Sequence, residues 1–425
     1  MRVAAGLRAA DGLAALISNG EGSGGRWSHV AAEPDRMAIL DPCAGAVFET
    51  LRDPVWSVGV IGLAAYDAGA RAATGLRDRV WPDLMLARYP AMLRFDHHLR
   101  TVEAIGRGAN GHDADRAAAV AFGWLERAAE VGVPPPAAEI MMEEASGADY
   151  EAAVADVVSR IASGELFQAN IARAWKGCLR QEAEPFDVFL RLQAGRASAY
   201  GAFWRMGERT LVSNSPELFL SLDGSRVEAR PIKGTRPRGR DAAEDARLAA
   251  ELAGSAKDRA ENLMIVDLMR NDLARTAQAG SVQVEALCEV ESHPTVHHLV
   301  STVSARLKPG LHVADALEAT FPPGSITGAP KHQAMKVIAA HEPPRGPWCG
   351  SLFMLDEGRM TASVLIRTAA FERLDGRWRF RTLAGAGITA DSDPRAERLE
   401  TEAKIRALAE ALIGDQGARA IRAPG

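Results

Sequence analysis

The chain has 425 residues, 47% hydrophobic and 25% charged, which is the balance of an ordinary globular protein with material for a large core. Its length predicts two or three domains, or one large α/β domain with extensions. The net charge of −5 and the scattered basic residues argue against nucleic acid as a partner. The first twenty residues do not resemble a signal peptide, and no apolar stretch is long enough to cross a bilayer. We therefore expect a cytoplasmic protein without membrane contact.

The four cysteines, Cys43, Cys178, Cys288 and Cys349, lie far apart and form no Cys-x-x-Cys pair. This spacing predicts neither a structural zinc site nor a disulfide framework. Free thiols in a reducing compartment are the expected outcome.

In chain order, residues 1–130 form a first region, in which residues 55–67 are expected to be apolar strands ending in a turn. The proline cluster at 131–147 predicts a linker, because clustered prolines cannot continue a helix. Residues 148–413 form the predicted main region. The Gly/Ala/Arg-rich tail, 414–425, is expected to fray.

Residues 149–163 carry apolar side chains at helical spacing. Apolar runs with the composition of strands follow, at 166–175, 200–206, 210–222 and 226–232. The last two predict a hairpin around Asp223 and Gly224, and two more hairpins are predicted with turns at 356–358 and 375–376. Long helical segments between hairpins favour an α/β chain of the α+β kind, with antiparallel sheets rather than βαβ winding.

Lys233 lies in the run RPIKGTRPRG, where the backbone is expected to turn sharply after an apolar strand. A buried amine tends to lose its charge, and an uncharged amine is a nucleophile. Arg236 and Arg238 are the neighbouring cations expected to lower the pKa of Lys233 further. The sequence thus indicates a reactive lysine in a pocket.

Two later segments place carboxylates at helical spacing, one starting after Ser255 and the other at Asp393. The residues concerned are Asp258 and Glu261 on the first helix, and Glu397, Glu400 and Lys404 on the second. Carboxylates on two facing helices suit Mg²⁺, which is completed by waters and substrate oxygens. Two solvated, ion-paired helix faces would have the same spacing, so the pattern leaves both interpretations open.

Two further segments suggest binding functions. Turn glycines before Pro330 and Lys331 at a helix start predict a site for a carboxylate or phosphate. His297 and His298 are adjacent in a strand-like segment, where neighbouring side chains face opposite sides. At most one of these histidines is therefore expected to face a given pocket.

The strings PIKGT, KDRAENLMIVDLMRND, HHLVST, GSITGAPK, WCGS, IRT and GAGI occur in the order typical of the chorismate-utilising enzymes, and the chain resembles that family from Leu166 through the helix of Glu397. The resemblance implies two antiparallel β-sheets packed together and surrounded by helices, with the active site between them. Aminodeoxychorismate synthases typically carry the lysine that matches Lys233 as a nucleophile, whereas anthranilate synthases usually carry alanine there. Isochorismate and salicylate synthases activate water with a different lysine, and the matching residue here is Gln168.

This resemblance implies an amination of chorismate by ammonia to 4-amino-4-deoxychorismate, of the transaminase class, in 4-aminobenzoate and folate biosynthesis. Lys233 would be the covalent nucleophile and Glu217 the general acid that protonates the departing C4 hydroxyl. Mg²⁺ would be held by Glu261, Glu397 and Glu400, with help from Asp258 through water. A separate glutamine amidotransferase subunit is expected to supply the ammonia.

The substrate-binding residues implied by the resemblance come from several motifs: Gly234, Thr235, His298, Thr327, Gly328, Arg367, Gly385, Gly387 and Lys404. Arg367 would hold the enolpyruvyl carboxylate. Family members often read Gly-Tyr shortly after the CGS string, but Leu352-Phe353-Met354 follows Ser351 here. A substrate contact from that tyrosine is therefore missing or replaced.

Two alternatives differ in what they require. An anthranilate synthase large subunit would also release pyruvate, and Lys233 argues against it. A catalytically silent chorismate-binding subunit would need no general acid, so the presence of Glu217 together with Lys233 and the metal-binding carboxylates argues against that alternative.

Overall fold

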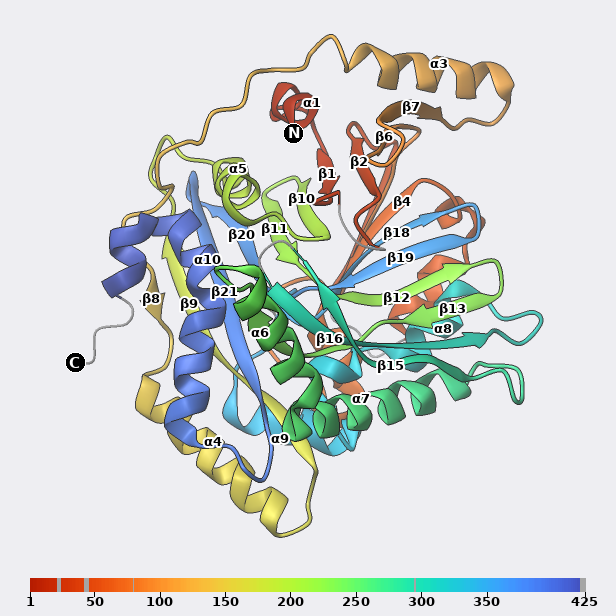
Figure 1. Cartoon of the computed structure of the whole chain (residues 1–425). Helices are drawn as coiled ribbons and strands as arrows, with labels where there is room; N and C mark the ends of the chain where they lie inside the picture. Colours follow the sequence, from red (N-terminus) through yellow and green to blue (C-terminus); the bar gives the residue numbers. More distant parts are fainter. Residues whose placement is uncertain (21–23, 42–45, 79, 294–295, 421–425) are drawn as a thin grey trace.

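The computed structural model describes residues 1–20, 24–41, 46–78, 80–293 and 296–420. Two antiparallel sheets make up its centre (Figure 1). The first sheet has the order β17 (Gly328–Ala329), β9 (Gln168–Cys178), β21 (Arg377–Ile388), β20 (Thr368–Leu374), β11 (Arg209–Ser215), β10 (Tyr200–Met206), β1 (Ala14–Ile17), β2 (Trp27–Ala31), β6 (Ala91–Asp96) and β7 (Thr101–Gly106), with β8 (Met142–Glu143) also paired to β9. The second has the order β14 (Ile232–Pro237), β16 (Val296–Arg306), β13 (Arg226–Ala229), β12 (Leu218–Asp223), β19 (Arg359–Val364), β18 (Ser351–Asp356), β4 (Val60–Ala64), β5 (Leu84–Arg88) and β3 (Arg36–Leu40), with β15 (Gln283–Ser292) also paired to β16.

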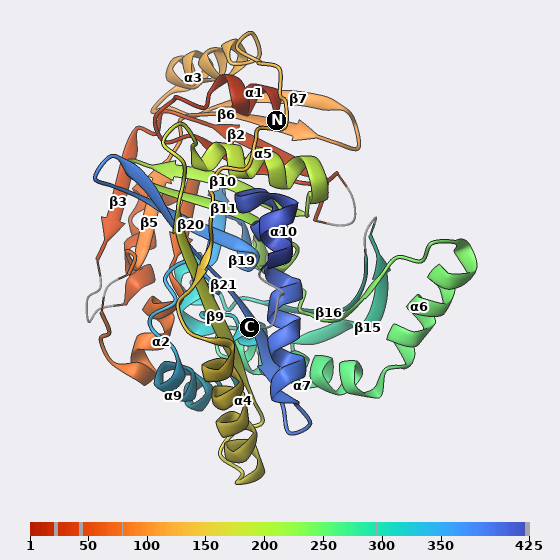
Figure 2. The same ribbon diagram turned by 90° about the vertical axis from the view of Figure 1, so that its left-hand side faces the viewer.

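Helices surround these sheets and are α1 (Arg2–Gly6), α2 (Tyr66–Thr74), α3 (Gly111–Gly123), α4 (Gly147–Ala162), α5 (Pro185–Arg196), α6 (Ala242–Gly254), α7 (Ala256–Ala274), α8 (Val313–Thr320), α9 (Lys331–His341) and α10 (Pro394–Ala420), with 3-10 turns η1 (Val47–Arg52), η2 (Pro54–Trp56) and η3 (Gly324–Ile326). In Figure 2, α6 stands away from the body of the molecule, beside β15 and β16. Within the described residues, no helix is both long and apolar enough to span a membrane.

The sheets pack face to face through a shared apolar cluster. Ile61 and Leu63 of β4 meet Trp204 of β10 and Leu211 of β11 in this layer. On its other side the first sheet packs against α5 and α10, where Trp175 of β9 is fully buried. The predicted fold, two packed antiparallel sheets surrounded by helices, is confirmed.

The predicted hairpins are also confirmed, and their turns explain why. Strands β18 and β19 pair across Glu357 and Gly358, and β20 and β21 pair across Asp375 and Gly376. All four of these residues have positive φ, between 49° and 77°. Two consecutive left-handed residues give the turn whose twist matches that of the paired strands.

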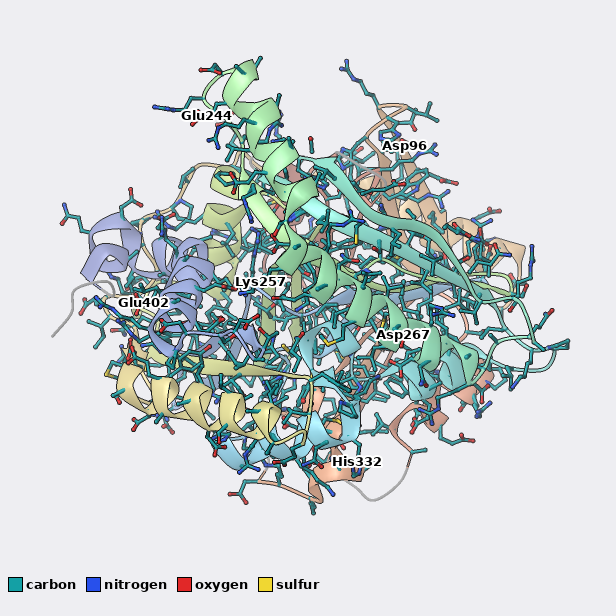
Figure 3. All side chains as sticks on the ribbon, turned by 60° about the horizontal axis from the view of Figure 1, so that its bottom comes forward. Asp96, Glu244, Lys257, Asp267, His332 and Glu402 are labelled. Carbon is teal, nitrogen blue, oxygen red and sulfur yellow. The ribbon has the colours of Figure 1, made fainter. Side chains whose placement is uncertain are left out.

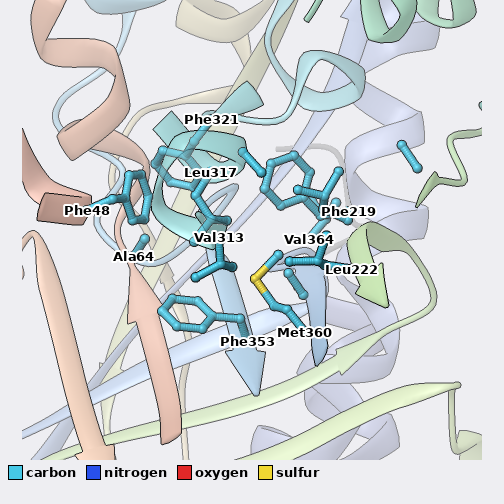
Figure 4. Packing of buried hydrophobic residues seen from close by; sticks show 14 of the residues in the cluster. Phe48, Ala64, Phe219, Leu222, Val313, Leu317, Phe321, Phe353, Met360 and Val364 are labelled. Carbon is cyan, nitrogen blue, oxygen red and sulfur yellow. The ribbon is translucent and has the colours of Figure 1, made fainter. Parts of the chain in front are cut away.

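An aromatic cluster connects the second sheet to the loop that follows α8 (Figure 4). The ring of Phe321 lies 5.4 Å from that of Phe48 in η1 and 6.2 Å from that of Phe219 in β12. All three side chains are buried. This packing fixes the start of the segment 321–328, which runs on into the candidate site.

Some local predictions need correction. Within residues 55–67 only Val60–Ala64 is a strand; η2 precedes it, because the Asp53 side chain accepts a hydrogen bond from the Val55 N–H, and α2 begins at Tyr66. The tail expected to fray is helical as far as Ala420, beyond a kink at Gly414, and residues 421–425 lie outside the described residues. Residues 128–141 contain neither helix nor strand, although Ala138 bridges to Leu179.

Three of the four cysteines lie in the part of the chain that the structure describes. Cys178 is an exposed free thiol, and Cys288 and Cys349 are buried free thiols. Cys43 lies outside the described residues.

Candidate active site

Lys233 lies on β14 at an irregularity in the pairing with β16. Ile232 pairs with Val300 and Thr235 with His298, so β14 has one residue more than β16 over this stretch. Such a bulge re-aims a side chain, and Gly234 supplies the positive φ of 86° in it. The sharp turn expected after the strand is therefore a bulge within β14, because β14 pairs with β16 on both sides of Lys233 and Gly234.

The surroundings of Lys233 favour a neutral amine. The half-buried side chain has its pKa lowered by burial, and Glu261 opposes this while the ammonium of Lys404 adds to it. The prediction that Arg236 and Arg238 play this part is wrong. Their charges are used in ion pairs with the helices that follow, Arg236 with Glu251 and Asp258, and Arg238 with Asp245.

Glu217 lies between β11 and β12 with only 5% of its surface exposed. Burial raises the pKa of Glu217 to about 7, although the Ser325 hydroxyl, the Lys233 ammonium and the Ile232 backbone N–H each favour the carboxylate. The Ser325 hydroxyl donates to Glu217 Oε1 at 2.7 Å. Glu217 is thus a buried carboxyl that holds a proton near neutral pH and lies within electrostatic range of Lys233.

The three predicted metal ligands come from two helices. Glu261 on α7 is half-buried, Glu397 on α10 is buried and Glu400 on α10 is exposed. Burial raises the pKa of Glu261 and of Glu397, and the negative charge of Glu400 contributes to both increases. Glu400 is therefore close enough to each of the other two carboxylates to repel it.

Two lysines partly neutralise this acidic group. Lys404 Nζ lies 2.6 Å from Glu400 Oε1, and Lys257 Nζ lies 4.0 Å from Glu261 Oε1. Figure 3 labels Lys257 between the ribbons of α7 and α10. Although partial burial opposes it, the pKa of Glu400 is lowered, with Lys404 as the main cause.

In donor type and charge, this group fits Mg²⁺, which prefers carboxylate oxygens. Among the residues that the structure describes, no three acidic, histidine or cysteine side chains converge as a metal centre would require. To bind an ion, Glu261 and Glu400 would have to turn away from Lys257 and Lys404. Glu397 would have to turn away from the Ser392 hydroxyl, which donates to its Oε1 at 2.7 Å. Asp258, expected to assist through water, is ion-paired with Arg236 at 3.2 Å.

Strands β9 and β21 form the floor of the site. A Cβ added to Gly387 would lie 2.7 Å from Gln168 Nε2 and 3.2 Å from Lys233 Nζ, so these three residues meet at one point. A Cβ at Gly385 would lie 2.7 Å from Asn170 Oδ1. Two strand positions apart, Gln168 and Asn170 share a face of β9.

These two amides are incompletely bonded. Gln168 is fully buried, and within the described residues neither its amide nitrogen nor its amide oxygen has a hydrogen-bond partner. Asn170 Oδ1 is also buried and also has no hydrogen-bond partner among these residues. Buried polar atoms normally have partners, and unpaired ones next to Lys233 indicate room for a polar ligand.

The remaining predicted contacts surround this floor. His298 and Thr235 share a hydrogen bond of 2.9 Å across the β14–β16 pair, and burial, assisted by the charge of Arg367, lowers the pKa of His298 to about 3. His297 faces away and is bonded to Ser292 and Asp245, as the alternation of strand side chains predicts. Arg367 has a φ of 51°, a conformation uncommon for a residue other than glycine.

The segment 321–328 contributes two more of the predicted substrate-binding residues, Thr327 and Gly328. Thr327 is buried and its hydroxyl donates to the Pro323 carbonyl oxygen at 2.8 Å. Gly328 has a φ of 137°, and a Cβ there would lie 2.2 Å from the Gln168 carbonyl oxygen, so only glycine fits. Lys404 reaches the floor by donating to the Gly385 carbonyl oxygen at 2.9 Å.

One sequence-based expectation about this region fails. Lys331 is not available to an anion, because its ammonium is paired with Asp272 at 2.5 Å and with the Thr320 carbonyl oxygen at 2.8 Å. In the segment that replaces the Gly-Tyr pair of the family, Phe353 of β18 is buried in the apolar core.

Three residues of the site were missed from sequence: Asn170, Lys257 and Ser325. The alternation of strand side chains from Gln168 could have indicated Asn170. Ser325 stands in the GSITGAPK string, but its contact with Glu217 spans 108 residues and has no local signal.

The comparison with known families agrees with this geometry. The family model for chorismate binding enzymes matches residues 22–410, so the chain belongs to the chorismate-binding enzyme family. A relative from Escherichia coli (strain K12), aminodeoxychorismate synthase component 1, is 40% identical over 365 residues, covering 83% of this chain and 77% of its own.

Anthranilate synthases are more distant. Anthranilate synthase component 1 of Thermus thermophilus is 37% identical, over 84% of this chain and 78% of its own. The crystal structure of anthranilate synthase component I from Streptococcus pneumoniae TIGR4 has a TM-score of 0.78 at 26% identity, covering 91% of this chain and 93% of that one.

Proposed function

We propose that this protein aminates chorismate with ammonia to give 4-amino-4-deoxychorismate, as component 1 of an aminodeoxychorismate synthase. The observation that carries the proposal is that Lys233 and Glu217 interact electrostatically in a chorismate-binding enzyme and have opposite pKa shifts. Burial lowers the pKa of Lys233 and raises that of Glu217 to about 7. Opposite shifts of this kind mark a nucleophile and an acid that work near neutral pH. The similarity to the E. coli relative supports the same function.

In the proposed reaction, the neutral Lys233 amine adds to C2 of the ring as the C4–O bond breaks. The departing hydroxyl takes the proton of Glu217 and leaves as water. Ammonia then forms the C4–N bond and the C2–N bond to Lys233 breaks, which restores the neutral lysine. The added nitrogen gives up a proton to the Glu217 carboxylate, which restores the acid. Two displacements replace one difficult displacement.

We assign the binding roles to the residues around this pair. Arg367, with the neutral His298 beside it, would hold the enolpyruvyl carboxylate, and Gln168 and Asn170 would bond to polar ring groups or to ammonia. Glu261, Glu397 and Glu400 would hold Mg²⁺, whose charge would balance the ring carboxylate when bound. This set gives each charged group of chorismate an oppositely charged partner.

A partner component follows from the name of the relatives, component 1. We propose that it is a glutamine amidotransferase that delivers ammonia, and that the reaction takes place in the cytoplasm.

The test is mass spectrometry of the products formed by the purified chain with chorismate, an ammonium salt and Mg²⁺ at mildly alkaline pH, with EDTA replacing Mg²⁺ in a parallel sample. We expect 4-amino-4-deoxychorismate without pyruvate, and no product with EDTA. Lys233→Ala should lower the rate by about 10³-fold or more, as loss of a nucleophile does. Lys176→Ala, at an exposed lysine of β9, is the control and should leave the rate unchanged.

Normal turnover by Lys233→Ala would exclude the covalent step. Anthranilate with pyruvate would instead support the second candidate function, anthranilate synthase, which the T. thermophilus and S. pneumoniae comparisons favour.

A further inference from the structure

The Glu217 carboxyl has hydrogen bonds from the Ser325 hydroxyl and from the Ile232 backbone N–H. Ser325 Oγ donates to Glu217 Oε1 at 2.7 Å, and both side chains are buried, 6% and 5% exposed. Burying a hydroxyl costs free energy unless it is hydrogen-bonded, and the partner of this one is a carboxyl 108 residues away in the sequence. The proposed reaction assigns no part to Ser325.

The structure around Ser325 fixes this hydroxyl. It belongs to η3, and the neighbouring Gly324 packs so closely on α7 that a Cβ there would lie 2.5 Å from the Leu268 side chain. Thr327 closes the loop with its hydrogen bond to the Pro323 carbonyl oxygen. Ser325 therefore presents its hydroxyl from a rigid support rather than from a mobile loop.

We propose that Ser325 is a positioning residue for the general acid, holding Glu217 by Oε1 so that Oε2 carries the proton that is delivered. The proposal rests on the proposed function. In the step concerned, the proton moves from Oε2 to the departing C4 hydroxyl as the C4–O bond breaks, and water leaves. The new carboxylate keeps the Ser325 hydrogen bond, which is stronger to an anion than to a neutral carboxyl. Ser325 itself transfers no proton.

The titratable groups that act on Glu217 are two lysines and one thiol. Lys233 on β14 and Lys404 on α10 favour the carboxylate, as do the hydrogen bonds from the Ser325 hydroxyl and the Ile232 backbone N–H. Cys349, just before β18, is a buried thiol whose pKa is raised mainly by burial, with Glu217 contributing. Removing the Ser325 hydroxyl leaves these charges in place, so the effect of the hydroxyl can be measured separately.

The decisive measurement is the pKa of Glu217 without substrate. Infrared difference spectra between pH 5 and 10 would follow its protonated carboxyl band, identified by its loss in Glu217→Gln. We expect Ser325→Ala to raise the pKa of Glu217 by about one to two units, because it removes a hydrogen bond to the charged form. An unchanged pKa in folded Ser325→Ala would overturn the proposal.

Thr320→Val is the matched control. Thr320 is buried in α8, five residues before Ser325, and its hydroxyl donates to the Ala316 carbonyl oxygen at 2.7 Å, away from Glu217. Its removal should leave the pKa of Glu217 unchanged. A shift as large as that of Ser325→Ala would point to a general loosening of the segment and overturn the specific role.

Kinetics separate the two proposals. With chorismate and an ammonium salt, Ser325→Ala should lower kcat about tenfold or more and move the alkaline limb of the pH profile upward, while Ser325→Thr, which keeps a hydroxyl, restores the wild-type limb. A wild-type limb in Ser325→Ala would contradict the positioning role. If the wild-type chain does not aminate chorismate, the proposed function fails, whereas the infrared result still decides whether Ser325 controls Glu217.

Discussion

Two buried asparagines use their amides in different ways. Asn262 of α7 donates to the Leu299 carbonyl oxygen at 3.2 Å and accepts from the Ser301 hydroxyl at 2.5 Å, which joins the helix to β16. Asn170 of β9 leaves Oδ1 without a partner among the described residues, beside Gly385. The first amide is structural, and the second fits a role in ligand binding.

Substitution by leucine, which has a similar shape, should separate these roles. Asn262→Leu should lower the free energy of unfolding by about 2–4 kcal/mol, because it strands two buried polar partners. Asn170→Leu should leave that free energy unchanged or raise it by up to about 1 kcal/mol, while KM for chorismate rises about tenfold. Urea denaturation and steady-state kinetics would measure both, and equal destabilisation by the two variants would make Asn170 a structural residue.

The residue that caps the start of α7, Ser255, helps to position the helix that carries Glu261. This helix follows α6 with only Ser255 between them, and the Ser255 side chain caps α7 by accepting a hydrogen bond from the Asp258 N–H at 3.2 Å. A capping hydroxyl satisfies one of the free N–H groups at a helix start. This cap also holds the turn that bears Asp258 beside the β14 bulge, where a Cβ on Gly234 would lie 2.9 Å from Asp258.

Ser255→Ala should therefore lower the free energy of unfolding by about 1 kcal/mol. Ser159→Ala is the control: this serine is exposed within α4, where alanine is the better helix former, so stability should rise by a few tenths of a kcal/mol. Denaturant midpoints would show whether Ser255→Ala lowers the free energy of unfolding and Ser159→Ala raises it. A destabilising Ser159→Ala or a neutral Ser255→Ala would contradict the assigned cap.

In the whole molecule, the raised pKa of Glu217 makes stability depend on pH. Its pKa is about 7 in the folded state against an ordinary 4.5, so the folded chain binds this proton more tightly than the unfolded chain. The resulting stabilisation is complete below about pH 4.5 and is lost as the pH rises through about 7, a change of about 3 kcal/mol.

Glu217→Gln should remove this contribution. We expect the wild-type free energy of unfolding to fall relative to that of Glu217→Gln between pH 5 and 8, as measured by urea denaturation at each pH. Other titrating groups are common to both proteins and largely cancel in the difference. A constant difference across this range would mean that Glu217 is already ionised in the folded protein at pH 5.

The architecture also shows that the chain on either side of residues 131–147 builds both sheets. Strands β1, β2, β6 and β7 extend the first sheet beyond β10, and β3, β4 and β5 extend the second beyond β18. Trp204 and Leu211 from the later region pack on Ile61 and Leu63 from the earlier one. The candidate site therefore rests on a core that neither region completes alone.

The sequence alone determined the features that depend on neighbouring residues. The hairpin turns at 356–358 and 375–376, the helix starts at Ser255 and Asp393, and the Lys233 motif were all predictable, because turn dihedrals and helix caps are local. Strand alternation also predicted that at most one of the two adjacent histidines faces the site.

Only the tertiary structure decided which charges and polar groups meet. Lys404 acts on the pKa of Lys233, whereas Arg236 is ion-paired with Asp258. Lys331 is ion-paired with Asp272, and the Ser325 hydroxyl donates a hydrogen bond to Glu217. The Lys404, Lys331 and Ser325 contacts each join residues at least 59 positions apart. The Arg236 ion pairs join β14 to α6 and α7. Burial and pairing energies act between such residues only after the two sheets and their helices have packed, and no local pattern in the sequence records them.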